Sequence, residues 1–198
     1  MNTIILFYVG VSFLHLSLRS QGYKTLGDVT KILLMPILIL FVLQSGSYPL
    51  LVVSLSFATL GDGFLTKGHQ GSCFLWGMGA FAVAHSLYAL QVLSLDVDWI
   101  LAGIALASLS VPFGLFTRLI GKQKGRPPYV AYAALFTILA ALMIGLQSLL
   151  CTLGVLLFIV SDTMIGLDSL NLKHFTNTSE MGSYILAQLL LILGFTAL

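Results

Sequence analysis

The chain has 198 residues, of which 58% are hydrophobic and only 8% are charged, and its mean hydropathy is +1.03. A soluble domain carries about 25% charged residues, so this composition excludes a soluble globular protein. The small formal net charge of +2 gives no reason to expect a nucleic-acid partner. Apolar runs of membrane-spanning length recur along the whole chain, and we therefore expect an all-α polytopic membrane protein with one transmembrane domain over residues 1–198.

We predict eight transmembrane helices in one bundle. The first two spans are short, which leaves seven spans as the alternative. The first segment has neither a basic leading region nor a clear small-residue cleavage site, so we interpret it as a retained span and not as a signal peptide. In chain order the predicted spans are Thr3–Leu18, Val29–Leu43, Tyr48–Leu65, Phe74–Leu93, Trp99–Leu119, Tyr129–Gln147, Leu149–Leu167 and Met181–Leu198.

The basic residues predict the orientation in the membrane. Eight of the nine lie in or beside the joints that follow spans one, three, five and seven, and the other joints and both termini have none. The positive-inside rule therefore places the odd-numbered joints in the cytoplasm and both termini outside. We expect a multi-pass protein of a plasma membrane, the inner membrane in a bacterium. The eight residues are Arg19, Lys24, Lys67, Arg118, Lys122, Lys124, Arg126 and Lys173.

Several polar side chains lie inside these apolar spans. Burying an ionisable group there costs about 2.5 kcal/mol or more, which makes each such residue a functional candidate. Asp162 is the clearest case, because long apolar stretches flank it. The rise of about 1.5 Å per helical residue places the whole set in the cytoplasmic half of the membrane, and we predict one pocket that opens to the cytoplasm. The set comprises Lys31, Asp62, His85, Tyr88, Tyr129, Ser161, Asp162 and Gln188.

Some of these residues also have a purely structural interpretation when each is taken alone. Lys31 could extend its ammonium to the membrane surface, and Asp62 could cap the end of its helix. His85 could be a hydrogen-bonded packing residue, and Tyr129 an interfacial anchor. We favour the shared pocket because independent placements would rarely bring all of them into one half of the membrane.

A short internal similarity links two of the spans. Residues 59–62 (TLGD) resemble residues 159–162 (IVSD), 100 positions later, and each segment ends in an aspartate. Four spans separate the two segments, so both helices would enter the pocket in the same direction. This is consistent with a parallel four-helix repeat, an arrangement that places sites between the repeats.

In their order along the chain, these residues resemble the YhhN-like lysoplasmalogenases. The matching features are Lys31 in the second span, LGDGFL around Asp62, AHSLY with His85 and Tyr88, LLFIVSD with Ser161 and Asp162, and YILAQLLL with Gln188. The resemblance implies a membrane hydrolase that cleaves the vinyl ether bond of a lysophospholipid, the lysoplasmalogen. The products would be a fatty aldehyde and glycerophosphoethanolamine or glycerophosphocholine, and neither a cofactor nor a metal is implied.

The residue types suit this chemistry. Vinyl ether hydrolysis needs an acid that protonates the β-carbon and an anion beside the oxocarbenium ion that forms, as in glycosidases. We expect Asp162, with the longer apolar flanks, to be the acid and Asp62 to be the anion, while His85 moves protons or orders water. Lys31 could instead hold the substrate phosphate. For substrate binding we expect Lys31, Tyr88, Tyr129, Ser161 and Gln188.

Two other functions compete with this hypothesis. Intramembrane Asp, His and Lys residues also serve proton-coupled transporters, although here the polar set stops in one half of the membrane. A zinc-dependent lipid hydrolase would need a ligand set, and the spacing of the four histidines does not resemble one. These histidines are His15, His69, His85 and His174.

Overall fold

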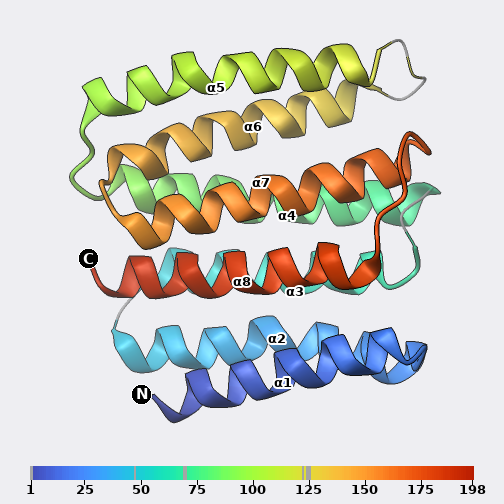
Figure 1. Cartoon of the computed structure of the whole chain (residues 1–198). Coiled ribbons are helices and arrows are strands. Elements are labelled where there is room, and N and C mark those ends of the chain that lie inside the picture. The colour runs from blue at the N-terminus through green and yellow to red at the C-terminus, as the bar shows by residue number, and fades with distance from the viewer. Residues whose placement is uncertain (1, 47, 69–70, 122, 124–125) are drawn as a thin grey trace.

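The computed structural model describes residues 2–46, 48–68, 71–121, 123 and 126–198. Within these residues the chain forms eight α-helices and no strands, which confirms the all-α prediction (Figure 1). The helices are α1 (Thr3–Ser20), α2 (Lys24–Ser45), α3 (Pro49–Leu65), α4 (Gly71–Leu93), α5 (Trp99–Leu119), α6 (Arg126–Gly145), α7 (Leu149–Ser169) and α8 (Asn177–Thr196).

Seven of the described helices are long and apolar enough to cross a membrane, which identifies an integral membrane protein. The exception is α3, whose 17 residues rise about 25 Å and which packs along α2 and α4. Four helices begin earlier than predicted, namely α2 at Lys24, α4 at Gly71, α6 at Arg126 and α8 at Asn177. The early start of α8 has a local cause, because the Thr176 side chain accepts a hydrogen bond from the Ser179 amide and caps the helix.

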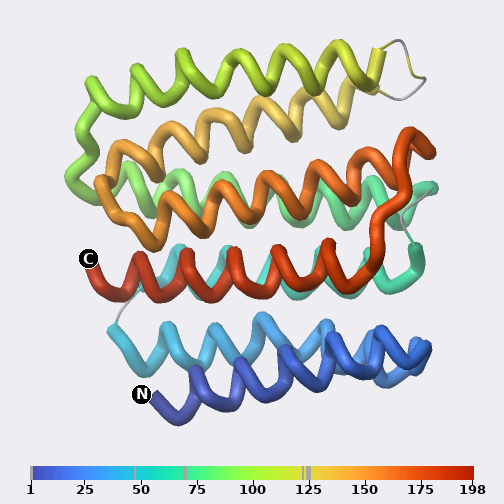
Figure 2. Tube along the Cα trace, viewed as in Figure 1, coloured from blue at the N-terminus to red at the C-terminus, as the bar shows by residue number. Residues whose placement is uncertain are grey.

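Most helices pack against their neighbours in the chain, and α8 closes the bundle against α1, α2 and α7. The approach of α7 to α8 depends on glycine, because a Cβ atom at Gly194 would lie 2.5 Å from the Cys151 sulfur. At the opposite edge, α5 packs extensively only against α6 in the described chain, and the traces in Figures 1 and 2 show it as the outermost helix on that side. The helices farthest from it are α1 and α2.

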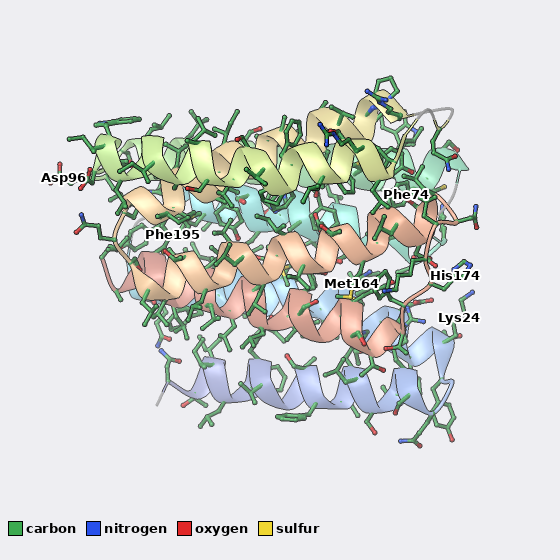
Figure 3. All side chains as sticks on the ribbon, turned by 45° about the horizontal axis from the view of Figure 1, so that its top comes forward. Lys24, Phe74, Asp96, Met164, His174 and Phe195 are labelled. Carbon is green, nitrogen blue, oxygen red and sulfur yellow. The ribbon has the colours of Figure 1, made fainter. Side chains whose placement is uncertain are left out.

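The two ends of the bundle differ in charge. Both termini lie at one end, and the joints after α1, α3, α5 and α7 form the other (Figure 1), which we call the basic end. In Figure 3, Lys24 and His174 mark the basic end, and Asp96 and Phe195 mark the opposite end. Lys122 and Lys124 of the predicted basic set lie outside the described residues. Those described are Arg19, Lys24, Lys67, Arg118, Arg126 and Lys173.

Candidate active site

A cavity of about 270 Å³ lies between seven of the helices, α2 to α8, toward the basic end of the bundle. Most of its wall is apolar and aromatic. Three charged side chains line it within the described chain, namely Lys31, Asp62 and Asp162. The structure therefore brings together three of the eight residues predicted for one pocket, from helices α2, α3 and α7, and Tyr129 of α6 is a fourth.

Asp62 is completely buried and has two polar partners. The Lys31 ammonium nitrogen lies 3.5 Å from its Oδ1 atom, and the Tyr184 hydroxyl donates a hydrogen bond of 2.7 Å to its Oδ2 atom. Both interactions stabilise the ionised carboxylate. Lys31 is only 4% exposed, so its side chain points into the bundle and does not reach the membrane surface.

Asp162 has a different environment in the same cavity. The Tyr132 hydroxyl donates a hydrogen bond of 2.6 Å to its Oδ2 atom, and both residues line the cavity wall. In the described part of the chain, no Lys, Arg or His nitrogen lies within 4.0 Å of the Asp162 carboxyl. Among the described side chains, one aspartate of the cavity is thus paired with a cation and the other is not.

Tyr129 lines the cavity near the basic end, as expected for a residue at the start of its helix. Its hydroxyl accepts a hydrogen bond of 3.0 Å from Ser169, and its ring stacks on Phe74 at a centroid distance of 5.9 Å. The tyrosine therefore joins α6 to α7 and α4 at the rim of the cavity.

Three of the other predicted binding residues lie outside the cavity lining, which corrects that part of the prediction. The Tyr88 hydroxyl donates a 2.8 Å hydrogen bond to the Gln188 side-chain oxygen, between α4 and α8. The Ser161 hydroxyl donates a 3.0 Å hydrogen bond to the Glu180 carbonyl, between α7 and α8. All three side chains are buried in helix contacts. The prediction failed here because the depth of a residue along its helix does not reveal which neighbouring helix its side chain faces.

His85 also lies outside the lining, contrary to the prediction. Its ring centroid is 4.3 Å from that of Phe136 and 4.6 Å from that of Phe158. Phe136 belongs to the cavity wall, so His85 lies behind this wall. Neither ring nitrogen has a hydrogen-bond partner of standard geometry within the described residues.

Sequence reasoning missed the two tyrosines that bind the carboxylates. A signal for both was present, since Tyr132 follows Tyr129 by three residues and Tyr184 precedes Gln188 by four, which are the spacings of one helix face. Glu180 was also missed as a buried residue. It is only 3% exposed and lies in the first turn of α8.

Replacing Tyr184 by Phe tests the tyrosine that binds Asp62. The variant leaves a buried carboxylate oxygen without its donor, so we expect the free energy of unfolding to fall by about 1–3 kcal/mol. Thermal unfolding in detergent measures the change, and Tyr23→Phe, at the exposed N-cap position of α2, is the matched control. Equal unfolding temperatures for both variants would show that the hydrogen bond contributes nothing to stability.

The described side chains include no ligand set for a metal ion. Among them, no group of three His, Cys, Asp or Glu residues is placed to hold one. His69, one of the four histidines considered from the sequence, lies outside the described residues. We therefore build the chemistry of the cavity on its carboxyl, ammonium and hydroxyl groups.

Comparison with known proteins gives two matches. The profile of the YhhN family matches residues 26–195, which include every residue of the cavity. Lysoplasmalogenase TMEM86A of Bos taurus is 33% identical over 172 residues, which cover 78% of this chain and 68% of that protein. No solved structure matches.

Proposed function

The chain belongs to the YhhN family, and on this premise we propose that it is a lysoplasmalogenase, which hydrolyses the vinyl ether bond of a lysoplasmalogen. The products are a fatty aldehyde and a glycerophosphoethanolamine or glycerophosphocholine. The observation that carries the proposal is the difference between the two aspartates of one cavity: within the described residues, Asp62 has a cationic partner and Asp162 has none. Vinyl ether hydrolysis needs such a pair.

The reaction begins when an acid gives its proton to the β-carbon of the vinyl ether. Asp162 fits this role, because it lines the cavity and no cation of the described chain lies within 4.0 Å of its carboxyl. Tyr132 donates to Oδ2 of Asp162, which holds the carboxyl in place and leaves Oδ1 to carry the proton. The first step therefore produces an Asp162 carboxylate and an oxocarbenium ion.

Water then completes the reaction. It adds to the oxocarbenium carbon and loses one proton to the Asp162 carboxylate, which regenerates the acid. The hemiacetal that results breaks its carbon–oxygen bond, giving the aldehyde and the free glycerol hydroxyl, so that one water molecule is consumed. Asp62 stabilises the cation through its negative charge, while Lys31 and Tyr184 keep this carboxylate ionised and oriented.

The residues outside the cavity lining have structural roles in this proposal. The Tyr88–Gln188 and Ser161–Glu180 hydrogen bonds fix α8 against α4 and α7. These contacts hold Tyr184, which is on α8, at the distance that its hydrogen bond to Asp62 requires. None of them needs to touch the substrate.

His85→Leu tests whether the imidazole takes part in catalysis. Because His85 lies behind Phe136 and its nitrogens lack partners of standard geometry in the described chain, we expect turnover within about 10-fold of wild type, less than the 10²-fold loss typical of an acid or base. The pH profile should keep its shape. A loss of about 10²-fold or more, with a missing limb of the pH profile, would assign the proton relay to His85 after all.

The basic end of the bundle faces the cytoplasm in our proposal, because its joints contain the arginine and lysine residues. The cavity lies toward that end. A water-soluble headgroup product would then leave on the cytoplasmic side, and the aldehyde would stay in the membrane.

Incubation of the purified protein with lysoplasmalogen, with and without a metal chelator, tests the function. We expect aldehyde release in both samples. The matched control is the saturated alkyl-ether lysolipid, which has no double bond to protonate and should release no aldehyde. Absence of aldehyde from the vinyl ether would favour the transporter alternative, and loss of activity with chelator would favour a metal-dependent hydrolase.

A further inference from the structure

The cavity contains an apolar stripe that the reaction itself does not use. Leu109, Pro112, Phe113 and Phe116 of α5 all line it, at the i, i+3, i+4 and i+7 spacing of one helix face. Yet α5 packs extensively only against α6 in the described chain, and it stands at the edge of the bundle (Figure 1). The four α5 residues therefore form one wall of the cavity, although, within the residues described, α5 does not pack closely against the helices that form the opposite wall.

One member of the stripe is exposed on the outside of the bundle. Pro112 lines the cavity and is also exposed, whereas the other described lining residues are buried or half-buried. The cavity wall thus reaches the lateral surface of the protein beside Pro112, at the height of the membrane interior. Pro112 also removes a backbone donor from the middle of α5, a feature that membrane helices tolerate where the helix kinks.

The length of the cavity indicates which part of the substrate needs this opening. On α7 the described lining ends at Ile159, three residues beyond Asp162, and on α6 it ends at Thr137, five residues beyond Tyr132. Helical rise converts these steps to about 5–8 Å. A membrane lipid chain fills about half of the 30 Å hydrocarbon core, or about 15 Å. A chain that starts at Asp162 is therefore too long to end inside the cavity.

We propose that the alkenyl chain of the lysolipid leaves the cavity sideways past Pro112 of α5, so that its outer part stays in the membrane while the vinyl ether lies between Asp62 and Asp162. The proposal rests on the lysoplasmalogenase function. It makes the α5 stripe the surface that selects the chain, and it lets substrate enter and aldehyde leave without passing through water.

Pro112→Trp tests the opening, because the indole would fill the space beside the stripe. With a membrane-length alkenyl chain, kcat/KM should fall by at least about 10-fold, the scale on which apolar contacts discriminate substrates. With a chain short enough to end inside the cavity, kcat/KM should stay near the wild-type value. Val111→Trp is the matched control, because Val111 is 63% exposed on the same helix and does not line the cavity. Equal loss for both chain lengths, or no loss with the long chain, would overturn the proposal.

Photolabelling provides a readout that needs no turnover. The probe is a saturated alkyl-ether lysolipid with a diazirine at the chain end, which the wild-type protein cannot hydrolyse by protonation of a double bond. We expect labelled peptides from α5, and less label in Pro112→Trp than in Val111→Trp. Label confined to α2, α3 and α8 would overturn the lateral path. A wild-type protein that is labelled on α5 but releases no aldehyde from any vinyl ether would refute the proposed function and leave the lipid path standing.

Discussion

Asp162→Asn is expected to lower turnover of lysoplasmalogen by at least about 10²-fold, the usual scale for a positioned acid. The amide keeps the shape of the carboxyl and can still accept the Tyr132 hydrogen bond, but it has no proton acidic enough for the β-carbon. The variant should remain folded, because Asp162 has no cationic partner in the described chain that the change would leave unpaired. Aldehyde release from purified protein measures the effect.

The pH profile identifies the role of Asp162. In wild type the acid must be protonated, so activity should fall as the pH rises and Asp162 ionises; the residual activity of Asp162→Asn should lack this alkaline limb. Asp96→Asn, on the exposed joint at the opposite end of the bundle (Figure 3), is the control with the same chemical change. Near-normal activity of a folded Asp162→Asn protein would reject the acid mechanism and leave the family assignment intact.

The helices were predictable from sequence because each apolar run is long enough to cross a membrane and polar joints separate the runs. The membrane itself imposes this simplicity, since only helices or closed barrels satisfy the backbone in hydrocarbon. The starts of α2 and α8 were placed too late, because their first turns contain polar residues such as Glu180 that resemble a joint.

The site was harder to predict, because the sequence gives the depth of a residue but not the rotation of its helix. Depth was enough to group Lys31, Asp62 and Asp162. An ionisable side chain inside a membrane span is costly unless it has a polar partner, so residues at one depth were expected to meet. It could not separate them from His85 and Gln188, which lie at similar depths but face neighbouring helices. Rotation depends on packing, and the wall that Phe136 contributes between His85 and the cavity exists only in the assembled bundle.

Asp62→Asn should affect both activity and stability. Turnover should fall by at least about 10²-fold, because the oxocarbenium ion loses its anion and faces the Lys31 ammonium instead. The variant also leaves this ammonium buried without a counter-charge, since Lys31 is only 4% exposed. Removing one partner of a buried ion pair costs about 3–5 kcal/mol, so the unfolding temperature should drop well below that of Asp162→Asn.

The double variant Lys31→Met/Asp62→Asn separates the two effects. Methionine fills a similar volume without charge, so the double variant should unfold at a higher temperature than Asp62→Asn alone, which is the non-additivity expected of a direct pair. Its activity should stay low, because the anion that stabilises the cation is still missing. Recovery of activity together with stability would mean that Asp62 serves only to neutralise Lys31. In that case the cation would have to be stabilised by another group, and the assignment of the two aspartates to different chemical roles would be wrong.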